Sequence, residues 1–206
     1  PTPKPAFAWT VDSVTVSGVG MILLATRLGR GGERWQRFSK VARALAHILI
    51  STSLFYVFFL FDNLPIAMAF LLAVLGYGML AVYTPSVFMV FAAVGASVGT
   101  VVFGLRFAEV PLSWYALAAT CLALVYLLVG FKVSRLGLSE AVSGQYKSAL
   151  HATGFFLTAV GALSGFVFAF TEVWPGVIGL TFAVVNLLVC AVLFKRAQFT
   201  LLAAGL

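Results

Sequence analysis

Long apolar stretches alternate with short polar segments along the whole chain of 206 residues. Seven stretches have about 18 to 22 residues each, close to the ~20 that a helix needs to cross about 30 Å of hydrocarbon. None carries an acidic or basic residue near its middle. The seven stretches are Trp9–Thr26, Ala42–Phe61, Pro65–Tyr83, Ser86–Leu105, Trp114–Phe131, Ala149–Phe170 and Trp174–Phe194.

This pattern predicts an all-α integral membrane protein, with residues 1–206 forming a single transmembrane domain built as a seven-helix bundle. Strands of a membrane barrel would alternate polar and apolar residues and would be about half as long. An open sheet cannot cross the bilayer, because its edge groups would lack hydrogen-bond partners. Helices are therefore the expected elements.

The least distinct boundary between two stretches is Tyr83–Ser86. Without a break there, Pro65–Leu105 would form one helix about 60 Å long, twice the thickness of the hydrocarbon layer. Pro85 disfavours helical geometry at Thr84, the residue before it. We therefore predict a tight turn at these four residues.

Basic residues concentrate in the segment Arg27–Arg43, which holds six of the thirteen in the chain. If this segment faces the cytoplasm, alternation of the spans places eleven basic residues inside and only Lys4 and Arg106 outside. Three tryptophans then fall at the outer interface, where aromatic side chains are enriched: Trp9, Trp114 and Trp174. We predict an outer N-terminus and an inner C-terminus, in a bacterial or archaeal cytoplasmic membrane.

Composition agrees with this interpretation. The chain is 62% hydrophobic and only 9% charged, whereas soluble domains average about 25% charged residues. The net charge of +7 alone would be compatible with a nucleic-acid partner. Because the basic residues lie in short segments between apolar stretches, membrane topology explains them better. We expect the lipid bilayer and other membrane protein subunits as partners, and no nucleic acid.

The outer turns share an acid followed by proline: Asp62–Pro65, Glu109–Pro111 and Glu172–Pro175. Such a pair is suited to a helix start, because the acid faces the positive end of the helix dipole and proline tolerates the first turn. The pattern suggests one extra helix followed by three helical hairpins, formed by spans 2–3, 4–5 and 6–7. The alternative is that any short outer turn would look alike.

Both ends of the chain carry less information. It opens with PTPKP and without an initiator Met, so we expect processing or a truncation at one or both ends. Three prolines in five residues favour an extended entry. The apolar tail Phe199–Leu206 is interpreted either as a short interfacial helix or as the start of an eighth span.

The two histidines, His47 and His151, occupy matched positions about one turn inside the inner interface, each four residues after a cation. A pair of imidazoles on facing helices can ligate a haem or a chlorophyll-type pigment. A histidine at this depth can also direct its polar tip toward the lipid headgroups. The structural role is the favoured interpretation, because the chain has no further histidine.

Two GxxxG motifs indicate close helix packing: Gly95 with Gly99, and Gly161 with Gly165. Asn186 is the strongly polar side chain nearest the middle of a span, so it should face another helix and bond to it. Thr120 and Thr158 can each bond the backbone of their own helix and indicate little by themselves.

The sequence lacks HExxH, a phosphate-binding glycine loop and any mid-span carboxylate or lysine. We therefore expect a non-enzymatic multi-pass membrane protein that serves as an accessory or scaffold subunit of a larger membrane complex. Two alternatives stay open. One is a transporter of small molecules or lipids built from helical hairpins, and the other is a haem- or pigment-binding subunit that uses His47 and His151.

Overall fold

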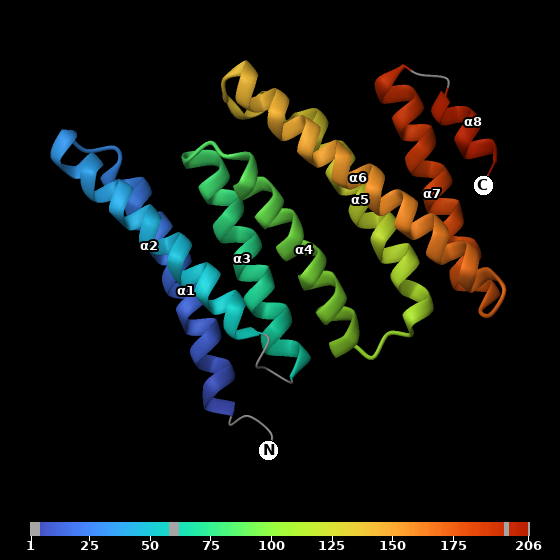
Figure 1. Cartoon of the computed structure of the whole chain (residues 1–206), viewed down its shortest axis with the longest axis horizontal. Helices are drawn as coiled ribbons and strands as arrows, with labels where there is room; N and C mark the ends of the chain where they lie inside the picture. The colour runs from blue at the N-terminus through green and yellow to red at the C-terminus, as the bar shows by residue number, and fades with distance from the viewer. Residues whose placement is uncertain (1–4, 58–61, 196–197, 206) are drawn as a thin grey trace. The chain divides into compact units, whose positions relative to one another are not determined.

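The computed structural model describes residues 5–57, 62–195 and 198–205, and within these ranges the chain is helical and has no strand (Figure 1). It divides into two compact units, Pro1–Ala108 and Glu109–Leu206. Seven of the described helices are long and apolar enough to cross a membrane. The prediction of an all-α membrane protein with seven spans is confirmed.

Unit 1 contains four long helices joined by short connections. Its core is made of side chains from all four, with Ile22, Ile50 and Leu80 among the most completely buried. The α1–α2 connection and the α3–α4 turn lie at the same end of this unit (Figure 1). The helices are α1 (Pro5–Leu28), α2 (Glu33–Val57), α3 (Asn63–Tyr83) and α4 (Val87–Phe107).

Unit 2 contains three long helices, two single 3₁₀ turns and one short helix. Leu127, Asn186 and Thr120 are among its most completely buried side chains. The short helix α8 packs against α7. The elements are η1 (Leu112–Trp114), α5 (Tyr115–Lys132), η2 (Val133–Leu136), α6 (Glu140–Ala169), α7 (Val173–Phe194) and α8 (Gln198–Ala204).

Helix pairing differs from the predicted hairpin grouping. In unit 1, α1 packs most extensively on α2 and α3 on α4, whereas α2 and α3 share a smaller contact. In unit 2, α5 and α6 form a closer pair than α6 and α7. Spans 6–7 therefore form a packed hairpin as predicted, whereas spans 2–3 share the smallest contact among the long helices of unit 1. Glycines lie in the more extensive contacts, since Gly18 of α1 lies against Ile50 of α2, and Gly154 of α6 lies against Leu127 of α5.

Several helices extend beyond the apolar stretches. Helix α2 begins at Glu33, so most of the basic segment Arg27–Arg43 is helical rather than a loop. Helix α6 begins at Glu140, nine residues before the predicted Ala149. Arg, Lys, Gln and Glu are good helix formers, and a helix can continue through the interface into water. The predicted end of the second span, at Phe61, lies outside the described residues.

The chain ends also follow helix propensity. Helix α1 begins at Pro5, and proline is well tolerated in the first turn of a helix. The rest of the predicted extended entry, residues 1–4, lies outside the described residues. The tail forms the short helix α8 (Gln198–Ala204), which is compatible with both interpretations.

The predicted turn at Tyr83–Ser86 is confirmed. Helix α3 ends at Tyr83, and Thr84 adopts φ −131° and ψ 85°, as expected for a residue before proline.

The turns that contain an acid followed by proline differ from one another. Asp62 caps α3 by accepting a hydrogen bond from the Leu64 amide at 3.2 Å, whereas Glu109 has φ 54° and lies in the turn after α4.

Candidate functional site

Asn186 of α7 joins the three long helices of unit 2. It is fully buried, and its Nδ2 donates to the backbone carbonyl of Thr120 on α5 at 2.8 Å and to Oγ1 of Thr158 on α6 at 3.2 Å. The Thr158 hydroxyl in turn donates to the carbonyl of Gly154. Both threonines bond their own helix, as expected, and also provide acceptors for the Nδ2 group of Asn186, whereas its Oδ1 has no hydrogen-bond partner among the described residues.

The hydrogen bonds of Asn186 with Thr120 and Thr158 form the Asn186 node. Glycines of α6 let the neighbouring helices approach this node. At Gly161, a Cβ atom would meet the Thr120 side chain and the carbonyl of Ala116, so this glycine faces α5. At Gly165, it would lie 3.1 Å from the carbonyl oxygen of Gly176 and from the amide of Leu180, so this glycine faces α7. The two glycines of one GxxxG motif therefore serve different helix contacts.

The second GxxxG motif, on α4, has only one glycine in a close contact. A Cβ atom at Gly99 would lie 2.7 Å from the Phe70 ring of α3. Gly95 is exposed and has open space within 4 Å of its Cβ position. The predicted packing role of Gly95 is wrong for contacts within unit 1, because this glycine lies on a face of α4 directed away from α3.

His47 is half-buried among α2, α3 and α4 of unit 1. Its Nδ1 lies 3.4 Å from the Ser51 hydroxyl, which lies 2.8 Å from the hydroxyl of Tyr77. The centroid of its ring lies 5.8 Å from that of Tyr77 and 6.4 Å from that of Phe88. These contacts connect three helices and give the imidazole a polar neighbour within its own unit.

His151 belongs to unit 2 and is only 6% exposed. The centroids of the Phe131 and Phe194 rings each lie 4.9 Å from that of the imidazole. Nε2 has no hydrogen-bond partner among the described residues, and it lies 2.5 Å from the Cβ position of Gly130. The imidazole therefore occupies the space that the missing side chain leaves, with the α5 backbone close to the nitrogen that a metal would use.

These surroundings favour packing over ligation for both histidines. We expect the purified protein to show no haem Soret band and no absorption of a chlorophyll-type pigment, and we expect His47→Gln to leave the thermal unfolding temperature nearly unchanged. Absorbance spectra and thermal unfolding of the wild type and of each single variant test this. A coloured preparation that bleaches in either His47→Gln or His151→Gln would establish a cofactor instead.

Arg43 connects three helices of unit 1 near the α1–α2 connection. Its Nη1 donates to the carbonyl of Tyr83 at 2.7 Å and to Oγ1 of Thr84 at 3.2 Å, and its Nη2 donates to Oγ of Ser39 at 3.0 Å. The buried Ser39 hydroxyl donates to the carbonyl of Ala25 on α1 at 2.8 Å. A guanidinium is well suited to the carboxyl end of α3, because it bonds free carbonyls and opposes the negative end of the dipole.

A polar pair also joins α1 to α2. The hydroxyl oxygens of Thr15 and Ser53 lie 2.6 Å apart, and both side chains are buried. Each hydroxyl also has a carbonyl of its own helix within hydrogen-bond distance. This pair joins the middle of α1 to the last turns of α2.

A groove of about 780 Å³ runs between α1 and α3 of unit 1. Its walls are mostly apolar, with Val16, Met68 and Leu72 among them, and two carboxylates, Asp12 and Asp62, also line it. Oδ1 of Asp12 is buried and has no hydrogen-bond partner among the described residues. The groove could hold a molecule that combines an apolar body with a polar or cationic group.

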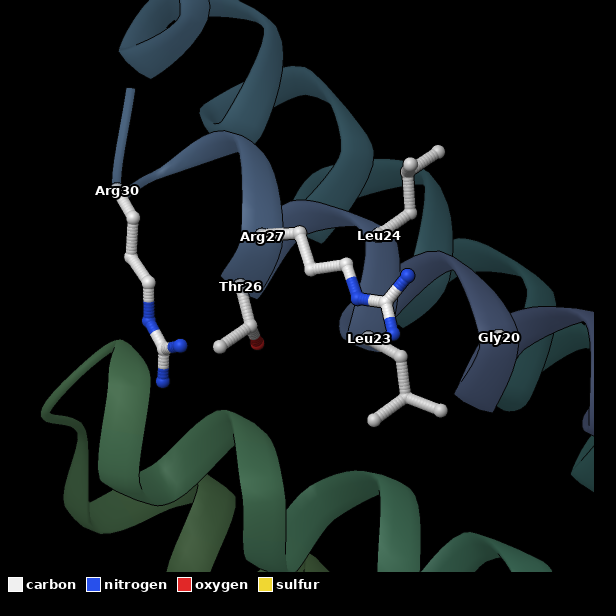
Figure 2. Close-up of a pocket in the computed structure, with 6 residues that line it drawn as sticks. All are labelled: Gly20, Leu23, Leu24, Thr26, Arg27 and Arg30. Carbon is white, nitrogen blue, oxygen red and sulfur yellow. The ribbon is translucent and has the colours of Figure 1, made fainter. Parts of the chain in front are cut away.

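A second hollow, of about 500 Å³, lies at the carboxyl end of α1 (Figure 2). Figure 2 shows that Arg30, Thr26 and Leu23 extend to one side of the helix, while Arg27 reaches across above Leu23. The hollow therefore combines an apolar wall with two guanidinium groups. Its full lining is Gly20, Leu23, Leu24, Thr26, Arg27 and Arg30.

Sequence reasoning missed both hollows and the Arg43 contacts. The basic segment was interpreted only through topology, although Arg27 continues the face of α1 that carries Leu23 and Leu24. Spacing along the helix was the signal that could have revealed this face. Among the described residues, no group of three or more His, Cys, Asp or Glu side chains is arranged to hold a metal ion.

The two predicted histidine ligands belong to different units, whereas Asn186, Gly161 and Gly165 belong to one and meet around α6. The best-defined constellations are thus the Asn186 node, the Arg43 contacts and the two hollows. No protein-family model, no curated protein and no solved structure matches this chain.

Proposed function

We propose that the chain is a non-enzymatic membrane protein that serves as an accessory or scaffold subunit of a larger membrane complex, with its basic segments toward the cytoplasm. The observation that carries this proposal is the Asn186 node. The most polar side chain near the middle of a span is used to hold α5, α6 and α7 together. A substrate path would instead direct such a group toward a water-filled cavity.

Other polar side chains within the spans also form contacts between helices. The Thr15–Ser53 pair joins α1 to α2, and the Ser51–Tyr77 contact joins α2 to α3. Many large apolar side chains remain exposed on the helices, for example Phe156, Leu163 and Val167 of α6, at 66%, 70% and 60%. Such side chains suit contact with lipid or with the spans of another subunit.

A transporter of small molecules or lipids is the second candidate function, and the groove between α1 and α3 favours it. The apolar walls and the buried Asp12 oxygen could hold a cationic, partly apolar substrate. Asp12→Asn should then abolish uptake of such a substrate into vesicles that contain the protein, whereas Thr181→Ala, in unit 2 and outside the groove, should leave the uptake nearly unchanged.

The subunit proposal is tested by purifying the protein in mild detergent from its native membrane, at its native expression level. Native mass spectrometry of the eluate should show a complex with a second membrane protein in a fixed stoichiometry. An unrelated seven-span protein that carries the same tag serves as the control and should not retain that partner. A preparation that contains only this chain, as a monomer or a homo-oligomer, would contradict the proposal.

A further inference from the structure

The hollow at the carboxyl end of α1 is organised along a single helix face. Gly20, Leu23, Leu24 and Arg27 follow one another at intervals of three, one and three residues, so they share one side of the helix. Arg30 follows in the turn after α1, and its side chain extends toward the hollow (Figure 2). Along the axis of α1 the surface therefore changes from apolar to strongly basic within about one turn.

The positive charge in this hollow is not neutralised by any residue that the structure describes. Among the described residues, neither Arg27 nor Arg30 makes an ion pair or a side-chain hydrogen bond. Glu33 is the only acid in the segment Arg27–Arg43. Two guanidinium groups without a counter-charge, on a helix that spans a membrane, attract anions from the headgroup layer.

The end of α1 itself adds less negative charge, because most of its last backbone carbonyls have donors. The carbonyl of Ala25 accepts from the amide of Gly29 at 2.9 Å and from the hydroxyl of Ser39 at 2.8 Å. The carbonyl of Leu28 accepts from the amide of Gly31 at 3.0 Å. These bonds reduce the repulsion that a free helix carboxyl end would exert on an anion.

We propose that this hollow binds an anionic phospholipid, with the phosphate held by Arg27 and Arg30 and an acyl chain lying along Leu23 and Leu24. The two leucines are 53% and 47% exposed, and the Cβ position of Gly20 has open space within 4 Å. An acyl chain covers this apolar surface, which a free phosphate ion would leave bare. The apolar wall thus selects a lipid over a soluble anion.

The chemistry of the arginines sets the preference among lipids. Guanidinium groups form charge-assisted, often bidentate hydrogen bonds with phosphate oxygens. The Thr26 hydroxyl already donates to the carbonyl of Ile22 at 2.8 Å, so it is not a donor to the ligand. A zwitterionic lipid brings an ammonium group that both arginines repel. We therefore expect phosphatidylglycerol to bind in preference to phosphatidylcholine.

Native mass spectrometry of the full chain in detergent tests this site. Equal amounts of phosphatidylglycerol and phosphatidylcholine are added, and the bound fraction of each lipid is measured over a concentration series. The wild type should retain phosphatidylglycerol at lower concentration. The double variant Arg27→Gln with Arg30→Gln should weaken that binding about tenfold or more, given the usual gain from each basic residue near an anionic headgroup.

The matched control is Arg37→Gln with Lys40→Gln, which removes the same charge from exposed positions of α2 outside the hollow. It should change the binding by no more than about twofold. Equal weakening in both double variants, or unchanged binding in the first, would overturn the site. Glycerol phosphate, which has the headgroup charge without acyl chains, should not displace the lipid at comparable concentration. Displacement by it would show a site for soluble anions and contradict the lipid assignment.

Discussion

Gly161→Leu should lower the free energy of unfolding by on the order of 2–3 kcal/mol, because it places a large side chain inside a closed helix contact. A Cβ atom at this position already meets the side chain of Thr120 and lies 3.0 Å from the carbonyl oxygen of Ala116. The substitution separates α5 from α6 and displaces the Thr120 backbone that accepts from Asn186. Thermal unfolding in detergent, followed by circular dichroism, measures the loss.

Gly95→Leu is the matched control, since it makes the same chemical change in the other GxxxG motif. Open space surrounds the Cβ position of Gly95, and leucine favours helix more than glycine does. The free energy of unfolding of this variant should lie within about 0.5 kcal/mol of the wild-type value or slightly above it. Equal destabilisation by both substitutions would contradict the described faces of α4 and α6.

Arg43→Gln should cost about 1.5–3 kcal/mol of stability, because it removes charge-assisted hydrogen bonds to three groups. The carbonyl of Tyr83 would lose its donor at the end of α3, and the Ser39 hydroxyl would lose its link to that helix. The stability of Arg43→Lys should lie between that of the wild type and that of Arg43→Gln, since one ammonium group cannot form all the hydrogen bonds of the planar guanidinium. Chemical or thermal unfolding in detergent compares the three proteins.

Arg37→Gln provides the control for the loss of charge. Arg37 is exposed on the same helix and makes no side-chain hydrogen bond with a described residue. Its substitution should change stability by less than about 0.5 kcal/mol. If Arg37→Gln and Arg43→Gln behave alike, net charge and not the observed contacts determines the stability of this end of unit 1.

The spans could be predicted from the sequence because hydropathy is summed over all the residues of a long stretch. Helix ends were predicted less accurately than the spans. The polar residues that begin α2 and α6 are good helix formers, so these helices continue beyond the apolar stretches. The turn at Pro85 was predictable, because proline restricts the residue before it directly.

Helix partners were harder to predict, because hydropathy does not say which face of a helix meets which neighbour. Gly95 and Gly99 belong to one motif, yet only Gly99 lies against α3. Asn186 was expected to bond another helix, and the acceptors it uses are the Thr120 carbonyl and the Thr158 hydroxyl. Arg43 was interpreted as a topology signal alone, because its bonds to Tyr83 and Thr84 cross 40 and 41 residues of sequence.

The threading of seven spans through the membrane is the central claim, and cysteine accessibility tests it most directly. Single cysteines are placed at Gly32, Asn63, Ser139 and Thr171 in a background without Cys121 and Cys190. Gly32 has open space at its Cβ position, and the Ser139 side chain makes no cap hydrogen bond. Each variant is labelled in sealed vesicles with a thiol reagent that does not cross the membrane.

The cysteines at positions 32 and 139 should react from the cytoplasmic side, and those at 63 and 171 only from the opposite side. Each variant should react fully after detergent opens the vesicles, which controls for buried thiols. Labelling of positions 32 and 63 from the same side, or of 139 and 171 from the same side, would contradict the seven-span threading.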